Sequence, residues 1–297
     1  MNPLSATSRS GSVPVRVYTP GWEQKLGVRI WGLMLAEVWH SRDLIWRLFW
    51  KQWVGQYRQT WLGYFWAIAP TLVAVFAFVL LRRHVLPKFK TPIPYVAYAM
   101  WGMTAWQFFS SCFQSAMNAL QESGPMISRI QFPRESLVFA SIGKNLFTFF
   151  LRLVAFAILI VVLYAKREEV QWAIPRTILL APFSLIPLFF FAVGLGMIMA
   201  VLLTLAGDVS NVTPLILQFG VFVTPGVMFP SSPQWPYLLL GLLNPVSAVI
   251  EGSQDLLAAG RLTQPNVYAA MTLFSLLVFL AGWRFFRLAL PRIQERF

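Results

Sequence analysis

RDLIWRLFWKQWVGQYRQTWLGYFWAIAP, from Arg42 to Pro70, is the stretch that decides the fold. At 100° per residue, one narrow arc of a helix holds Asp43, Arg47, Lys51 and Arg58. The opposite side holds Ile45, Trp46, Phe49, Trp50, Trp53 and Tyr57. This pattern predicts a basic, aromatic amphipathic helix that lies in a membrane interface and runs directly into an apolar segment. Such a helix is either a simple anchor or a lever that passes force into the bilayer, and this stretch fits both.

The composition defines the class of protein around this stretch. The chain is 57% apolar and only 12% charged, with a mean hydropathy of +0.62. A soluble domain carries about 25% charged residues. The chain is therefore a polytopic membrane protein. Its net charge of +13 does not indicate nucleic acid, because the positive residues lie mainly at the ends of apolar segments.

The apolar segments give the number of spans. A transmembrane helix needs about 20 apolar residues. The candidates are roughly 61–81, 95–119, 136–165, 176–204, 210–229 and 266–287. We predict an all-α integral membrane protein with six transmembrane helices per subunit. The predicted parts are a mobile cytoplasmic tail (1–25), an amphipathic interface or gate region (26–60), a transmembrane domain (61–290) and a short cytoplasmic tail (291–297).

The segment before the last span is irregular. Residues 236–260 are moderately apolar but are interrupted by Asn244, Pro245 and Gly252, and they carry Glu251 and Asp255. We predict a re-entrant helix pair over 230–260 that dips into the outer leaflet without crossing it. A folded extracellular loop is the alternative.

Lysine and arginine counts orient the chain. With the N-terminus inside, 14 of these residues fall on the inner side and eight on the outer side, which predicts that both termini are cytoplasmic. The outer loop from Arg82 to Lys90 opposes this rule. It is either a contact for anionic lipid or substrate phosphate, or a solvated cluster.

Features of common enzymes are missing. The sequence contains no phosphate-loop motif, its eleven acidic residues form no close pair inside a span, and its single cysteine, Cys112, lies in an apolar segment. His40 and His84 lie at opposite membrane faces by the predicted topology and cannot share a metal. We therefore expect no cofactor in this chain and no enzyme activity of the chain by itself. An integral membrane glycan-processing enzyme is the less favoured alternative.

A second cytoplasmic stretch runs from Leu120 to Glu135. Ser123 caps a predicted short helix and Pro133 ends it. The helix presents an apolar face flanked by basic residues; the face and its flanks are Met126, Ile127 and Ile130 with Arg129 and Arg134. This face docks on a partner or packs on the inner ends of the protein's own spans.

The third span carries a polar stripe. It consists of Ser141, Lys144, Asn145, Thr148 and Arg152. Arg152 lies near mid-depth, where an ionisable group must face protein or water. The stripe either lines a transport path or contacts a lipid phosphate, or it forms a structural ion pair with Asp208, Glu251 or Asp255.

Aromatic residues make up 16% of the chain. Most must contact lipid or form the core, but some can stack on sugar rings. The candidates for an aromatic channel are Trp101, Trp106, Phe109 and Phe222.

Three motifs together resemble a known family. They are the run from Tyr57 to Pro70, the Phe132-Pro133-Arg134 triplet, and Asn244-Pro245 followed by Glu251-Gly252. Over about residues 40–290 the chain resembles ABC-2 type permeases that export polysaccharide. It is most similar to O-antigen and lipopolysaccharide exporters, with capsular polysaccharide and teichoic-acid permeases as near relatives.

The resemblance implies a homodimer in a bacterial inner membrane that works with two copies of a cytoplasmic ATPase, which binds ATP and Mg²⁺. The implied substrate is a polyprenyl-pyrophosphate-linked glycan moved from the inner to the outer leaflet. The implied coupling helix to the ATPase contains Glu122, Met126, Ile127, Arg129, Ile130, Pro133 and Arg134.

The resemblance also assigns the two ends of the path. The gate helix with lipid-pyrophosphate candidates contains Arg47, Lys51, Tyr57 and Arg58, and the outer gate contains Asn244, Pro245 and Glu251. One departure stands out: Ala206-Gly207-Asp208 follows the fourth span, where relatives often carry a basic residue before the acidic one.

Overall fold

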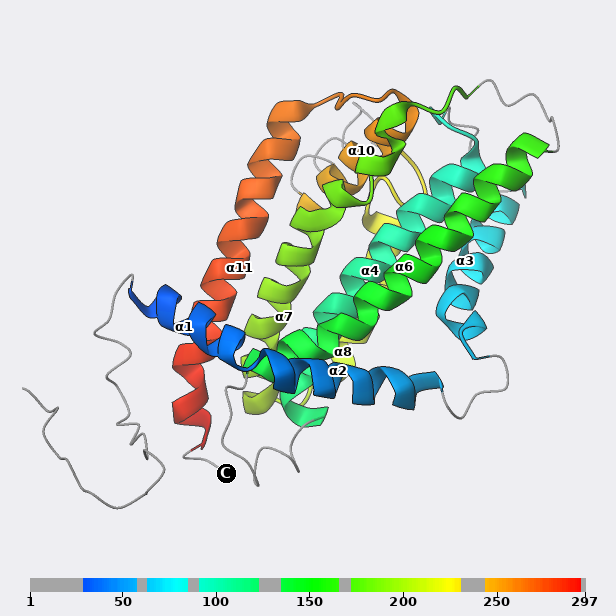
Figure 1. The fold of residues 1–297 in the computed structure, drawn as a ribbon. Coiled ribbons are helices and arrows are strands. Elements are labelled where there is room, and N and C mark those ends of the chain that lie inside the picture. The colour runs from blue at the N-terminus through cyan, green and yellow to red at the C-terminus, as the bar shows by residue number, and fades with distance from the viewer. Residues whose placement is uncertain are drawn as a thin grey trace, which may run out of the picture.

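The computed structural model describes residues 29–57, 63–84, 91–122, 135–165, 172–230 and 244–294. Over these ranges the chain consists of helices joined by turns, and no strand occurs (Figure 1). The all-α prediction is confirmed for this part of the chain. The helices are α1 (Arg29–His40), α2 (Arg42–Tyr57), α3 (Phe65–His84), α4 (Tyr95–Glu122), α6 (Glu135–Ala165), η2 (Arg176–Leu180), η3 (Phe183–Leu185), α7 (Ile186–Leu205), α8 (Val209–Val223), α10 (Pro245–Ala258) and α11 (Pro265–Gln294).

The predicted amphipathic region is two helices rather than one. The break lies at Ser41, whose backbone N–H and hydroxyl both donate to the carbonyl oxygen of Glu37, at 3.0 and 2.8 Å. These bonds satisfy the carbonyl oxygen of Glu37 in the last turn of α1, and α2 starts at the residue after Ser41. Figure 1 shows α1 and α2 lying across the lower ends of the long helices, so we call this the α2 end and the opposite one the α10 end.

Four helices are long and apolar enough to cross a bilayer: Phe65–His84, Glu135–Ala165, Phe183–Leu205 and Pro265–Ala289. Helices α4 and α8 occupy the other two predicted positions. Helix α8 is apolar but has only 15 residues, and α4 has 28 residues but is less apolar. The count of six spans is therefore not established by length and composition.

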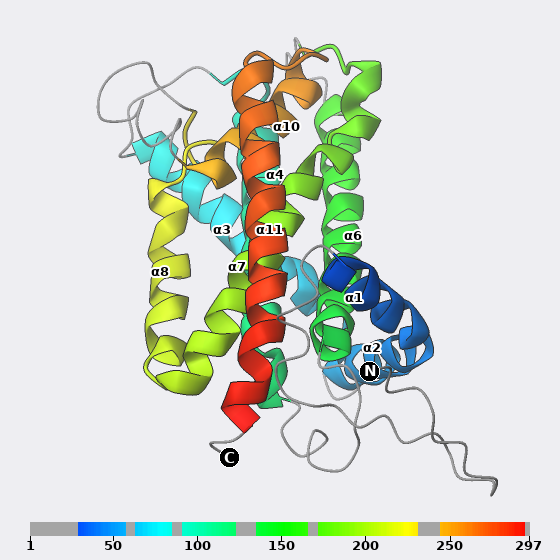
Figure 2. The same cartoon turned by 90° about the vertical axis from the view of Figure 1, so that its left-hand side faces the viewer.

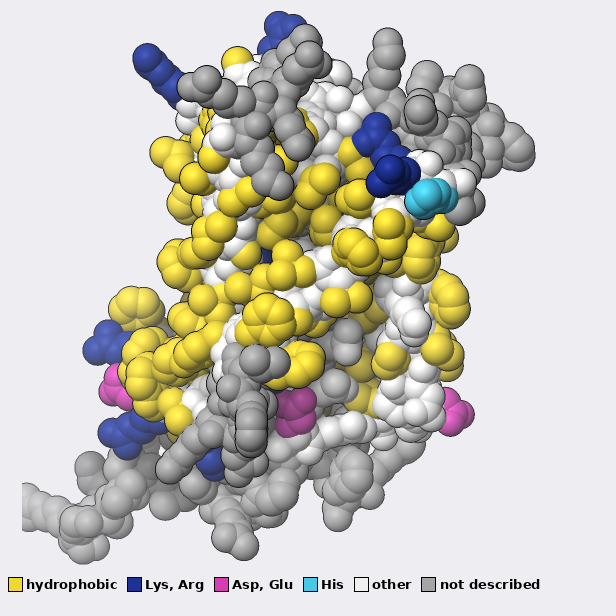
Figure 3. All heavy atoms as spheres, turned by 90° about the vertical axis from the view of Figure 1, so that its right-hand side faces the viewer, with side chains coloured by type: hydrophobic (Ala, Val, Ile, Leu, Met, Phe, Trp, Pro, Cys, Tyr) yellow, Lys and Arg dark blue, Asp and Glu magenta, His cyan; other side chains and the backbone are white. Residues whose placement is uncertain are grey.

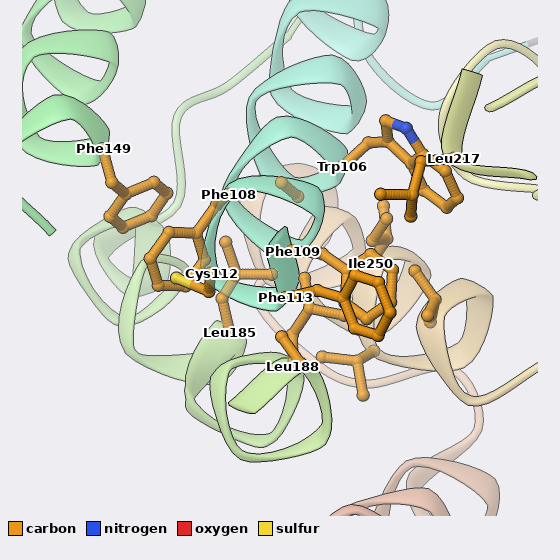
Figure 4. Packing of buried hydrophobic residues seen from close by; sticks show 14 of the residues in the cluster. Trp106, Phe108, Phe109, Cys112, Phe113, Phe149, Leu185, Leu188, Leu217 and Ile250 are labelled. Carbon is orange, nitrogen blue, oxygen red and sulfur yellow. The ribbon is translucent and has the colours of Figure 1, made fainter. Parts of the chain in front are cut away.

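The position of α4 explains its polarity. It contacts α3, α6, α7, α8 and α10, and 19 of its 28 residues are buried. Its side chains therefore meet protein rather than lipid. Phe108 of α4 stacks on Phe149 of α6 with ring centroids 4.3 Å apart, and Cys112 is buried beside this pair (Figure 4). The core is built around this central helix.

Helices α7 and α11 make the closest contact between two long helices. A Cβ added to Gly282 would lie 2.2 Å from the carbonyl oxygen of Gly194, and one added to Gly194 would lie 2.4 Å from the Cα of Phe279. Only glycine allows the two backbones to approach this far, which is the way small residues pack membrane helices.

The α10 end differs from the prediction in two places. The segment 176–204 begins with the 3₁₀ helices η2 and η3, because Pro175, Pro182 and Pro187 interrupt regular helix formation, and α7 starts only at Ile186. The segment 210–229 is helical only to Val223 and ends in a turn with Gly226 at φ 87°. Of the predicted re-entrant pair, α10 is described, and residues 231–243 lie outside the described ranges.

The surface fits a membrane protein. On the face shown in Figure 3, hydrophobic side chains form a broad band, and charged side chains gather above and below it. Helix α8 stands at the margin of the bundle (Figure 2), and its side chains Ile216 and Phe219 are both 61% exposed. The structure thus offers a continuous apolar surface to lipid or to another membrane helix.

Candidate functional site

The first part of the site is helix α2, which is seated on the start of α6. Leu48 is buried against Leu137 and Ala140 of α6. One turn further along α6, Gly143 leaves room for the ring of Phe49, since an added Cβ would lie 2.6 Å from its Cδ2 atom. Helix α2 is therefore attached to the bundle through its Leu48 side.

An aromatic row runs along α2. The ring centroids of Trp46 and Trp50 are 6.3 Å apart and stacked, and those of Trp50 and Trp53 are 4.8 Å apart. Trp53 also contacts Phe147 of α6 edge-on at 5.0 Å. The row therefore starts against the bundle and extends outward, where Trp46 is 62% and Trp50 50% exposed.

The exposed part of this row forms a groove with two cations. Trp46, Arg47, Trp50 and Lys51 line a shallow, open surface groove of about 420 Å³ on one side of α2. Guanidinium and ammonium groups bind phosphate oxygens, and indole faces pack on apolar or sugar C–H surfaces. We name these four residues the α2 groove. Its chemistry suits a phosphorylated, sugar-bearing lipid head.

Only part of the predicted gate helix lies among the described residues. Arg47 and Lys51 lie in the α2 groove. Tyr57 is the last residue of α2, and Arg58 lies outside the described residues. The helical-wheel pattern put Trp46 and Trp50 away from the cations, whereas the structure sets them beside Arg47 and Lys51. The reason is helical geometry: at 100° per residue Trp50 lies only about 60° and Trp46 about 100° from Arg47, so both flank the cations.

The polar stripe of α6 lies inside the bundle. Asn145 Nδ2 donates to the Ser111 carbonyl oxygen at 3.0 Å and to Ser115 Oγ at 2.9 Å, both on α4. Ser141 Oγ donates to the Ser115 carbonyl oxygen at 3.1 Å. These bonds join α6 to α4 along the core.

Deeper along the same stripe, Arg152 is 7% exposed and its Nε donates to the carbonyl oxygen of Ala67 on α3 at 3.1 Å. Thr148 donates to the Lys144 carbonyl oxygen of its own helix at 3.1 Å. The carboxylate of Asp255 accepts from the Thr263 N–H at 2.8 Å, and Asp208 is exposed before α8. The stripe thus contacts both α3 and α4, and its role in transport stays a prediction.

The coupling-helix prediction falls almost wholly outside the described residues. Glu122 is the last residue of α4 and is exposed. Met126, Ile127, Arg129, Ile130, Pro133 and Arg134 lie in the range 123–134, of whose structure nothing is described. The described ends on either side, Glu122 and Glu135, mark where this segment joins α4 and α6.

Three of the four aromatic channel candidates are core residues in this chain. Trp101, Trp106 and Phe109 are 2%, 7% and 5% exposed, and Trp101 Nε1 donates to Ser253 Oγ of α10 at 2.7 Å. Phe222 of α8 is 47% exposed and contacts Phe78 of α3. Phe222 is thus the candidate that is open to a ligand or a neighbouring helix.

The outer-gate candidates build the start of α10. The Asn244 side chain accepts from the Val246 N–H at 3.0 Å and donates to Thr224 Oγ1 at 3.2 Å. Pro245 occupies the first turn, where its missing N–H costs nothing. A Cβ on Gly226 would lie 3.0 Å from Glu251 Cγ, so this side chain packs on the preceding turn. The motif therefore fixes α10 against the end of α8.

A charged cluster at the α2 end was missed by the sequence reasoning. Arg287 Nη1 of α11 donates to Glu37 Oε2 of α1 at 2.5 Å and to Glu135 Oε1 of α6 at 3.0 Å. The partners are 250 and 152 residues away in sequence, so no local pattern indicates them. Among the described residues, no group of three or more His, Cys, Asp or Glu side chains is placed to hold a metal ion.

The fold and these elements define a helical integral membrane protein with a cationic, aromatic helix, α2, across one end of the bundle. Comparison with known proteins gives the family: a model described as ABC-2 type transporter matches residues 43–257. This match covers well over half of the chain, and the chain belongs to the ABC-2 type transporter family. The resemblance seen in the sequence motifs is thereby confirmed.

One curated relative carries the comparison further. The chain is 24% identical over 256 residues to the O-antigen export system permease protein RfbA of Myxococcus xanthus. The alignment covers 84% of this chain and 93% of that protein. The similarity therefore extends over nearly the full length of the relative.

Proposed function

We propose that this chain is the transmembrane subunit of an ABC exporter that moves a polyprenyl-pyrophosphate-linked polysaccharide, O-antigen, across the bacterial inner membrane. The family match and the similarity to an O-antigen export permease support this function. The structural observation that carries it is the α2 groove, in which two cations and two exposed indoles lie side by side.

The groove suits the head of such a lipid. A pyrophosphate presents several anionic oxygens, which Arg47 and Lys51 would contact with charge-assisted hydrogen bonds. The first sugar follows directly on the pyrophosphate, and its C–H face would pack on Trp46 or Trp50. An interfacial helix rich in tryptophan also keeps the groove at headgroup depth, where the lipid phosphate lies.

The motor is proposed to be a separate chain. Two copies of a cytoplasmic ATPase would bind ATP and Mg²⁺ and dock on the segment 122–134 of two permease subunits. Both termini and α1–α2 would then lie on the cytoplasmic side, with α10 and the rest of 230–260 at the outer end. Helices α4 and α8 would complete six spans once the dimer and lipid surround them.

The glycan path is proposed to lie between two copies of the chain. Phe222 and the exposed side of α8 would face it, while the α6 stripe with Lys144, Asn145, Thr148 and Arg152 would hold its wall together. Asn244, Pro245 and Glu251 would position the outer closure.

The test is transport by the purified chain together with a phosphate-loop ATPase sought among the neighbouring genes, reconstituted in liposomes with a lipid-linked glycan. The variant Arg47→Gln with Lys51→Gln should lower export at least tenfold, because each charge-assisted contact contributes about 1.5–3 kcal/mol. Arg42→Gln is the matched control, since Arg42 is an exposed cation of the same helix that lies over Trp39 and outside the groove.

Export that is unchanged in the double variant would remove the groove from the mechanism. Absence of a complex and of ATP hydrolysis would remove the exporter assignment itself. Lipid-linked capsular polysaccharide and teichoic acid, offered in the same assay, distinguish the alternative substrates. A change in the glycan without any ATPase would instead favour the glycan-processing enzyme.

A further inference from the structure

The charged cluster at the α2 end has an aromatic layer beside it. Trp283 lies one helical turn before Arg287 on α11. Its ring is 6.0 Å from that of Trp31 on α1 and 5.7 Å from that of Phe139 on α6, edge-on in both cases. The ionic and aromatic layers therefore connect the same three helices. We name these residues the α1–α6–α11 joint: Trp31, Glu37, Glu135, Phe139, Trp283 and Arg287.

The two carboxylates of the joint are held unequally by their own helices. Glu135 lies in the first turn of α6, where the helix dipole stabilises a negative charge. Glu37 lies in the last turn of α1, where the same dipole disfavours it. Glu37 is thus the partner that the local field holds less firmly.

Burial points in the same direction. The side chains of Glu135 and Arg287 are 4% and 10% exposed, whereas that of Glu37 is 20% exposed. Removing a partner from a buried ion pair is costly, and a carboxylate with access to water can leave at lower cost. The 2.5 Å contact shows that the Glu37 pair is closed in this conformation.

The joint also lies between two elements of the proposed mechanism. Helix α6 begins directly after the segment 123–134, which is proposed to meet the ATPase. Helix α1 leads through Ser41 into α2 and its groove. Arg287 therefore links the start of α6 to the helix that precedes α2.

We propose that Arg287 is a positioning residue that stays paired with Glu135 and releases Glu37 during the transport cycle, so that α1 turns away from α11 about Ser41 while α2 stays seated on α6. This inference rests on the proposed exporter function. Helices α6 and α11 form the fixed side of the joint, and α1 forms the moving side. Trp31 slides off Trp283 in the same movement, while Phe139 keeps its contact.

The first experiment needs no ATPase and compares two isosteric changes in the full chain in nanodiscs. Glu135→Gln should lower the thermal unfolding midpoint, and Glu37→Gln should leave it close to that of the unmodified chain. An equal drop of the unfolding midpoint in the two variants would show that Arg287 binds both carboxylates equally firmly, and would overturn the proposal.

The second experiment uses the complex with the ATPase. Glu37→Gln should keep ATP hydrolysis but lower glycan exported per ATP by about fivefold, which corresponds to about 1 kcal/mol at 25 °C. Glu37→Asp, which keeps the carboxylate, should retain part of this ratio. If the Glu37→Gln complex exports as much glycan per ATP as the unmodified complex, Glu37 has no role in transport.

Cross-linking then reports the movement itself. In a Cys112→Ala background, Trp31→Cys with Trp283→Cys should be bridged by a short bis-maleimide, which alkylates both thiols, without nucleotide and several-fold more slowly after vanadate trapping. Phe139→Cys with Trp283→Cys is the matched pair and should react alike in both states. If the two cysteine pairs cross-link alike in both states, the proposal is overturned. If the unmodified complex hydrolyses no ATP, the exporter function is refuted instead. The comparison of unfolding midpoints between Glu135→Gln and Glu37→Gln does not depend on that function.

Discussion

Phe49 of α2 lies directly over Gly143 of α6, close enough that a Cβ on the glycine would stand 2.6 Å from the ring. This contact and the burial of Leu48 set how near the α2 groove lies to the bundle. A larger residue at position 143 must displace the ring or the whole helix.

Gly143→Leu should therefore weaken the seating of α2 by about 1–3 kcal/mol, the usual cost of overpacking. The measurement is the free energy of unfolding together with protease access to α2. Phe49→Ala in the same chain should recover part of the loss, because it vacates the space. Additive losses in the double variant would show that the two residues do not share this contact.

The α7–α11 contact gives a sharper prediction, because backbone rather than a side chain meets the new atom. Gly282→Ala would place its Cβ 2.2 Å from the Gly194 carbonyl oxygen and should lower stability by about 3 kcal/mol. Gly55→Ala is the control, since nothing lies within 4 Å of its Cβ and alanine favours helix α2. A thermal unfolding series checks both, and a neutral Gly282→Ala would contradict the close packing.

Arg152→Met tests whether the deep arginine serves transport or stability. Its bond to Ala67 contributes about 1.5–3 kcal/mol, and an arginine at this depth costs about the same, so the net change in stability should be small. Export should fall while expression and the unfolding midpoint stay near those of the unmodified chain. Phe150→Met, at an exposed position of the same helix, is the control. Parallel losses of export and stability would favour a structural role.

Asp255, near the end of α10 and outside the spans, gives a pH dependence. Burial raises the pKa of its carboxyl above the usual value, and the hydrogen bond from the Thr263 N–H lowers that pKa in part. A raised folded-state pKa means that stability is full below about pH 3.9, the ordinary value, and is lost as pH rises through the folded-state pKa.

Asp255→Asn should accordingly raise the unfolding midpoint at neutral pH and change it little at the lowest accessible pH, because asparagine retains an oxygen that accepts from Thr263. Exposed Asp208→Asn is the control. A stabilisation by Asp255→Asn that is the same at every pH would rule out the ionisation of this carboxyl as its cause.

Much of the helical layout is predictable from apolar runs, because a helix in lipid must satisfy its own backbone and carry apolar side chains. The boundaries depend on local chemistry that the runs do not show. Ser41 divides the amphipathic region because it bonds back to Glu37, and the prolines near 176–187 replace regular helix with 3₁₀ turns. Such effects change an element without changing the hydropathy around it.

The site was predictable where neighbours in sequence are neighbours in space. Arg47 and Lys51 are one turn apart on α2, so their shared groove follows from the helical repeat. The seating of Leu48 on α6, which leaves Trp46 and Trp50 exposed, depends on tertiary packing that no wheel of α2 alone contains. The sequence around Arg287 indicates no more than a positive charge at the end of a span, since its partners Glu37 and Glu135 reach it through tertiary packing.

The central position of α4 has a consequence for how the chain is made. A helix of modest apolarity is weakly retained by the bilayer on its own, and α4 is synthesised before α6 and α7, the helices that later enclose it. As one of the six proposed spans, α4 would therefore depend for its integration on partners that do not yet exist when it leaves the ribosome. Substitutions in α6 or α7 at the α4 contact should thus act first on biogenesis. They should lower the amount of protein in the membrane more than the transport rate of each inserted molecule.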